Sequence, residues 1–177
     1  MSVFRLKPSK ETIKKNKLIK LKELKKNVYR KERQLYRNSR SQKKTEADYS
    51  DTTRQTKMVQ TQMIPFLKSK LPGNTDQDEI DFINLAIVNA EIELISADLD
   101  RIKDIIDQYN IDEEEETISG NWANFATEIN QLTELAQTKY MPIFKRKLAA
   151  LIKKYPANKK YIEDEVRIFQ SYFPHSD

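Results

Sequence analysis

The sequence predicts an all-α fold, an elongated helical bundle built on one long helix, and two observations carry this prediction. Apolar residues recur at intervals of three and four along most of the chain, which is the spacing of one face of a helix. No stretch of the sequence alternates apolar and polar residues over a useful length, as a half-buried strand does. The chain is therefore expected to consist of helices and the segments that connect them.

The long helix is expected over about residues 76 to 109. Thr75 and Asp76 are candidate N-caps, and Asp76 with Glu79 has the spacing of a capping box. One apolar stripe, the seam, runs along the whole helix, and a second covers another face of its first half. The seam consists of Leu85, Val88, Ile92, Ile95, Leu99, Ile102, Ile106 and Tyr109, and the second stripe of Ile80, Ile83, Ile87, Ala90 and Leu94. A seam of this spacing fits a coiled-coil partner or other helices of the same chain, and the further helices below favour the second.

Shorter helices are expected on both sides of the long one. A basic helix with Ser9 as its N-cap is predicted to reach about Asn38, and it has a narrow apolar stripe. Residues 38–62 are polar, which predicts a linker or a segment that folds against a partner. The Pro72-Gly73 pair predicts a turn, and the acidic run 112–116 predicts a loop or the first turn of a helix. Three more helices are expected over about 121–140, 144–155 and 162–173, which divides the chain into a basic arm and linker (1–62) and a helical body (63–177).

Charge is segregated along the chain. Residues 1–71 contain 21 Lys and Arg against 6 Asp and Glu, whereas residues 72–138 contain 2 against 17 and residues 139–177 contain 9 against 4. The net charge of +5 conceals this division. A basic arm on an acidic body suits a polyanion, an acidic partner surface, or the body of a neighbouring copy of the same chain.

Composition excludes several kinds of site. The chain has no cysteine, so disulfides, thiolate catalysis and cysteine-ligated metals are ruled out. The one histidine, His175, is expected to be a solvated tail residue, because no second ligand is near it in the sequence. The longest unbroken apolar run, residues 85–88, is far shorter than the roughly 20 residues that a membrane-spanning helix needs. We therefore expect a protein that is neither secreted nor membrane-spanning.

Clusters of carboxylates also fail to predict a reaction. Asn74, Asp76 and Asp78 have the spacing that begins a calcium loop, but Glu79 and Leu85 stand where the loop needs Gly and Glu. The acidic residues of the long helix lack the Glu-x-x-His pattern of di-iron bundles. There is no phosphate-binding glycine loop and no Ser/His/Asp set. The sequence thus predicts a protein that is not an enzyme and has no cofactor, no metal and no small-molecule substrate.

Two functions remain, and both use the basic arm. In the first, the protein is a structural subunit of a large assembly, a homo-oligomer or part of a hetero-assembly, and the arm contacts acidic neighbouring subunits. The alternative is a nucleic-acid-binding protein whose basic helix contacts a viral genome or ribosomal RNA, and the acidic body disfavours it. The expected arm contacts are Lys14, Lys22, Lys25, Lys26, Tyr29, Arg30, Arg33, Tyr36, Arg37 and Arg40. The expected contacts on the acidic face are Asp100, Asp104, Asp107, Glu113, Glu114 and Glu115.

A repeat within the arm bears on this choice. Val28-Tyr29-Arg30 recurs as Leu35-Tyr36-Arg37, two helical turns later, so both Tyr-Arg pairs project from one side. Such a strip could bind phosphates or bases, but a solvated face whose tyrosines cover the edge of the apolar stripe is favoured. By analogy of size, helix content and arm, the assembly that we expect is a virion, with the chain as a head-to-tail adaptor. An intracellular assembly is the other expected location.

Overall fold

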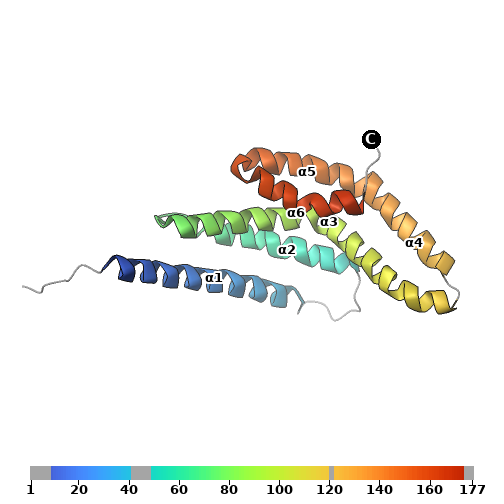
Figure 1. The fold of residues 1–177 in the computed structure, drawn as a ribbon, viewed down its shortest axis with the longest axis horizontal. Coiled ribbons are helices and arrows are strands. Elements are labelled where there is room, and N and C mark those ends of the chain that lie inside the picture. The colour runs from blue at the N-terminus through green and yellow to red at the C-terminus, as the bar shows by residue number, and fades with distance from the viewer. Residues whose placement is uncertain (1–8, 41–48, 120–121, 174–177) are drawn as a thin grey trace, which may run out of the picture.

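The computed structural model describes residues 9–40, 49–119 and 122–173, and the fold in these ranges is all-α, as predicted (Figure 1). The α-helices are α1 (Lys10–Arg40), α2 (Tyr49–Lys68), α3 (Gln77–Ser119), α4 (Trp122–Leu135), α5 (Met141–Lys154) and α6 (Lys159–Tyr172). A π-helix, η1 (Ala136–Tyr140), joins α4 to α5, and a 3-10 turn, η2 (Pro156–Asn158), precedes α6. In Figure 1, α3 lies in the middle, with α1 and α2 on one side and α5 and α6 on the other.

The predicted seam of α3 forms the first hydrophobic core, and it packs within the chain. Val88, Leu99 and Ile102 are at most 1% exposed, and they meet buried side chains of α5 and α6. The contributions of the later helices are Met141, Phe144, Leu148, Leu151, Ile162, Val166, Phe169 and Phe173. The seam weakens at its start, where Leu85 is 37% exposed. The coiled-coil alternative is therefore not needed to bury this stripe.

The second stripe of α3 forms a separate core with α1 and α2. Ile83 and Ile87 are buried against Val59, Met63 and Leu67, which follow one another at four-residue intervals on α2. The side chains that α1 adds to this core are Val28 and Leu35. Because α3 supplies one face to each core, it holds the whole described structure together.

Two expectations about element boundaries were wrong. The long helix does not end near residue 109 but continues to Ser119, through the acidic run that we expected to be a loop or the first turn of another helix. Glutamate is a strong helix former, and nothing in residues 110–119 is a helix breaker. The expected linker 38–62 is also helical from Tyr49 onward, although residues 41–48 lie outside the described ranges. The expected division of the chain at 62/63 therefore falls inside α2.

The predicted caps and turn are present. The backbone N–H of Thr12 donates to Ser9 Oγ at 3.2 Å, and that of Asp78 donates to Asp76 Oδ1 at 3.0 Å, so α1 and α3 begin at the expected N-caps. Between α2 and α3, Gly73 has a φ of 75°, a left-handed conformation that glycine adopts without steric strain. The Pro72-Gly73 turn is thereby confirmed.

The helix expected over 121–140 is observed as α4 followed by η1. The N–H of Met141 donates to the carbonyl of Ala136, five residues earlier, which is the hydrogen bond of a π-helix. Pro142 stands in the first turn of α5, directly after the wide turn, at a helix position that proline favours. Ala136 and Met141 are both buried, so the wide turn itself packs on the first core.

Candidate partner-binding surfaces

The N-terminal half of α1 is the most exposed helical segment of the described structure. Every residue from 9 to 20 is exposed, whereas Val28 and Leu35 further along the same helix are 3% and 8% exposed. Figure 1 shows this end of α1 extending past the ends of α2 and α3. Three apolar side chains stand in the exposed half, with Ile13 at 42%, Leu18 at 59% and Ile19 at 51% exposure. We call residues 10–22, with their lysines and these apolar side chains, the free half of α1.

The structure divides the predicted arm contacts into exposed and engaged side chains. The exposed ones are Lys14, Lys22, Lys26, Tyr29, Arg30, Arg33 and Arg37. Lys25 is half-buried, with its Nζ 5.4 Å from the centre of the Phe82 ring. Tyr36 is also half-buried, and its hydroxyl accepts a hydrogen bond from Gln60 Nε2 at 3.3 Å. The side chain of Arg40 lies outside the described residues. Thus the two tyrosines of the repeat differ, because Tyr29 is open to solvent and Tyr36 belongs to the packing of α1 on α2.

An acidic groove lies where α1, α3 and α6 approach one another. Glu32 of α1, Glu93 of α3 and Glu165 of α6 line a hollow of about 460 Å³. The part of the chain that the structure describes contributes no Lys, Arg or His to its lining. Apolar side chains share the floor, among them Phe82 and Leu85 of α3. The groove therefore offers negative charge and apolar surface together.

The carboxylates of the acidic groove destabilise one another's charged form. Burial, followed by the negative charges of Glu32 and Asp100, raises the pKa of Glu93 to about 7. Burial also raises the pKa of Glu32. Glu93 has one polar partner, since Gln60 Nε2 donates a hydrogen bond to its Oε2. A cation brought into the groove would relieve this repulsion and favour the ionised carboxylates.

The predicted acidic face continues from the groove along α3, but its members are not equivalent. Asp100 and Asp104 are surface residues. Partial burial of the Asp100 carboxyl, followed by the negative charge of Asp104, raises the pKa of Asp100. We call these two residues the acidic row. Asp107 instead accepts hydrogen bonds from Lys103 Nζ at 2.8 Å and from the Tyr172 hydroxyl, and these bonds, that of Lys103 first, lower its pKa. Asp107 thus links α3 to α6. Glu113, Glu114 and Glu115 lie on α3, but their side chains are outside the described residues.

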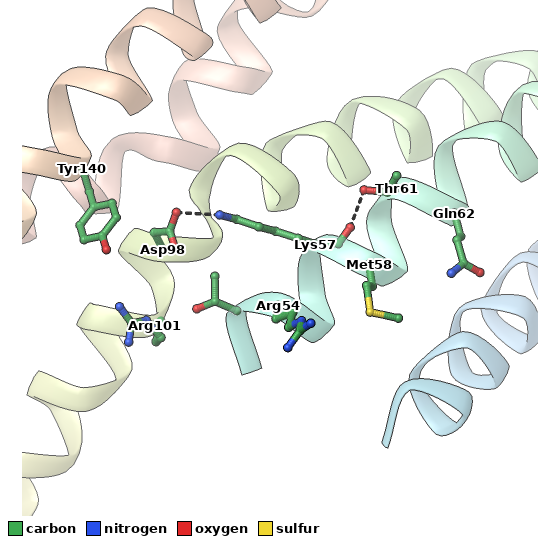
Figure 2. A pocket seen from close by; sticks show the side chains of 9 residues that line it. Arg54, Lys57, Met58, Thr61, Gln62, Asp98, Arg101 and Tyr140 are labelled. Atoms are coloured by element: carbon green, nitrogen blue, oxygen red, sulfur yellow. Dashed lines mark hydrogen bonds and ion pairs between the residues drawn. The ribbon is translucent and has the colours of Figure 1, made fainter. Parts of the chain in front are cut away.

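A second hollow, which sequence reasoning missed, lies between α2, α3 and η1 (Figure 2). It measures about 630 Å³, and Arg54, Lys57 and Arg101 are among its lining residues. Lys57 Nζ lies 2.9 Å from Asp98 Oδ2. The available signal was Arg101 itself, one of only 2 basic residues in the acidic span 72–138. We call this site the cationic hollow.

The described ranges hold neither a metal-binding cluster nor a membrane-spanning helix. Within the described ranges, no three His, Cys, Asp or Glu side chains are grouped so that they could hold a metal ion. No helix there has the length and apolar character that a membrane crossing requires. Comparisons with protein families, with curated proteins and with solved structures gave no match. The function is therefore argued from the surfaces alone.

Proposed function

We propose that the chain is a non-enzymatic structural subunit of a larger assembly, in which the free half of α1 lies on the acidic surface of a neighbouring copy. The observation that carries this proposal is the combination of lysines with exposed Ile13, Leu18 and Ile19 on one unsupported stretch of helix. Exposed apolar side chains gain stability when they are removed from water. Because no described part of the same chain covers it, the covering surface comes from a partner.

Exposed apolar groups favour a protein partner over nucleic acid. Phosphates are bound by charged and hydrogen-bonding groups, and bases stack on aromatic rings, so neither needs exposed isoleucine or leucine. Helix α1 offers one exposed tyrosine, Tyr29, because Tyr36 is half-buried and hydrogen-bonded to Gln60. The expected strip of paired tyrosines is therefore reduced to a single ring, which weakens the nucleic-acid alternative.

The acidic groove and the acidic row have the properties that the partner surface needs. They combine carboxylates, with no Lys, Arg or His in the described lining of the groove, and apolar side chains such as Leu85, which is 37% exposed. Lys103 is the one cation that acts on the acidic row among the described residues. Lysines of the free half would stabilise the ionised form of Glu93 and Asp100, and its apolar side chains would cover the apolar floor. Both surfaces occur on every copy, so the contact joins different faces of successive subunits.

A head-to-tail contact of this kind closes into a ring when its rotation permits and otherwise extends into a filament. A ring is what a head-to-tail adaptor of a virion forms, and the virion stays the setting that we predict from the sequence.

A charge-swap experiment tests the contact. The arm variant carries Lys14→Glu, Lys17→Glu and Lys20→Glu, and the body variant carries Asp100→Lys and Asp104→Lys, all at exposed positions. We expect the parent to self-associate in sedimentation experiments at low salt. Each variant alone should have an association constant at least tenfold lower, and the chain that carries both sets of changes should regain most of the parent's affinity. High salt should weaken self-association of the parent, because salt screens exposed charges.

The matched control reverses three other exposed lysines, by Lys147→Glu, Lys153→Glu and Lys160→Glu. It should associate as the parent does. A parent that stays monomeric at every concentration, or a control that fails as the arm variant does, would overturn the proposal. Nucleic-acid affinity is measured in parallel on a short duplex. If the arm variant loses that affinity, the body variant tightens it and self-association is unchanged in both, nucleic-acid binding is the function.

A further inference from the structure

We propose that the cationic hollow binds the phosphate group of a small phosphorylated molecule. It lies between α2, α3 and η1, and Figure 2 shows Arg54, Lys57 and Arg101 among its lining side chains, with Tyr140 above Arg101. Phosphate oxygens are strong acceptors, and arginine binds them through a planar array of N–H donors. The hollow shows three features of a site built for such a group.

The first feature is a guanidinium with an unused buried donor. Nε of Arg101 is inaccessible to solvent and has no hydrogen-bond partner. Most buried donors in native proteins are hydrogen-bonded, so a missing partner calls for an explanation. The rest of this guanidinium has no hydrogen bond or ion pair with a described residue, so a phosphate that enters the hollow would supply acceptors to its other N–H groups.

The second feature is a buried hydroxyl in the same lining. Thr53 is 7% exposed, and its Oγ1 has no hydrogen-bond partner. Thr53 precedes Arg54 on α2, while Arg101 comes from α3, so donors from two helices line one space. Two unpartnered buried groups in one hollow have a single explanation if one ligand binds both.

The third feature is the balance of charge. Lys57 is paired with Asp98, which neutralises that cation and also fixes its position. Arg54 and Arg101 have no carboxylate partner among the described residues, so the hollow retains positive charge inside an otherwise acidic region of α3. An anion entering it is attracted to the two arginines, and Asp98 is already neutralised by Lys57.

The size and lining of the hollow indicate more than a lone phosphate ion. Its volume of about 630 Å³ falls within the range of roughly 300–1,000 Å³ that is common for small-molecule sites. Met58 and Tyr140 add apolar and aromatic surface beside the cations. The π-helix that positions Tyr140 is a rare element that occurs often at functional sites. A phosphate on an organic group therefore fits better than inorganic phosphate.

The test uses the full chain and calorimetric titration with two probes, inorganic pyrophosphate and ATP. Arg101→Met and Arg54→Met should each weaken ATP binding at least tenfold. Thr53→Val keeps the side-chain shape but removes the hydroxyl, so it should weaken ATP binding about fivefold while the protein melts no lower than the parent. The control is Lys68→Met, which removes the same charge from an exposed site elsewhere on α2 and should change affinity less than twofold.

Several outcomes would overturn the proposal. They are a parent that binds neither probe at millimolar concentration, arginine variants that bind ATP as the parent does, and a Lys68→Met variant that loses as much as they do. Pyrophosphate binding as tight as that of ATP would refute the organic part of the ligand. A single-stranded oligonucleotide that displaces ATP at lower concentration would refute a small molecule. No residue of α1 lines the hollow, so these results are separable from those on self-association.

Discussion

Truncating two leucines of the same helix should separate folding from assembly. Leu35→Ala removes a side chain that is 8% exposed and packed in the second core, so unfolding should become easier by about 2 to 5 kcal/mol. Leu18→Ala removes one that is 59% exposed, and alanine is the better helix former. The unfolding free energy of the Leu18→Ala monomer should therefore change by less than about 1 kcal/mol.

The effect on assembly should be the reverse. Complete burial of a leucine side chain contributes roughly 1.5 to 3 kcal/mol. Covering the 59% of Leu18 that is exposed therefore contributes roughly 1 to 2 kcal/mol to the contact between copies. Its loss should raise the dissociation constant about five- to thirty-fold, since each 1.4 kcal/mol corresponds to a factor of about ten.

Two measurements test this reasoning. Urea unfolding at low protein concentration gives the stability of each variant, and sedimentation over a concentration series gives its self-association. The reasoning fails if Leu18→Ala lowers the unfolding free energy as much as Leu35→Ala does, because residue 18 would then be packed in the monomer. It also fails if Leu18→Ala associates with the affinity of the parent.

Three further predictions concern the fold and its pH dependence. Ile102→Ala should lower the unfolding free energy by about 2 to 5 kcal/mol in urea titrations, because Ile102 is 0% exposed in the seam. A loss below about 1 kcal/mol would contradict that packing. The pKa of Glu93 is raised in the folded state from an ordinary 4.5 to about 7, so the folded protein holds this proton more tightly than the unfolded chain. The unfolding free energy should therefore fall as the pH rises from about 4.5 to about 7. Glu93→Gln should flatten that part of the pH profile, apart from the smaller contributions of Glu32 and Asp100, and an unchanged slope would show that Glu93 titrates normally. Gly73→Ala should destabilise the protein by about 1 to 2 kcal/mol through its φ of 75° alone, since a Cβ there meets no atom within 4 Å, and unaltered thermal unfolding would contradict this.

The sequence was most informative where apolar spacing is regular. The positions of the seam from Val88 to Ile106 could be predicted because their burial repeats with the helical period. The end of α3 could not, because acidic residues both solvate loops and form good helices, and the run 112–116 contains no helix breaker that would decide between them. For α2 the polar residues concealed a stripe of only three deeply buried apolar side chains, Val59, Met63 and Leu67.

The sites were less predictable than the fold. Charge segregation identified α1 and α3 as the basic and acidic elements, but it could not show which lysines contact aromatic rings or that Asp107 is bound by Tyr172. Those contacts join residues far apart in the sequence. The cationic hollow depends in the same way on Thr53, Arg101 and Tyr140, which come from three different elements. The spacing of residues within one helix carries no information about such contacts between helices.

The π-helix between α4 and α5 acts as a phase shift in the helical register. A turn that closes through the bond from Met141 N–H to the Ala136 carbonyl holds one residue more than an α-helical turn. Each residue advances an α-helix by about 100°, so deleting a single residue from η1 would remove the wide turn and rotate everything after it by that angle. Phe144, Leu148 and Leu151 would then turn away from α3 toward solvent. The orientation of α5, and with it the first core, is therefore set by one extra residue.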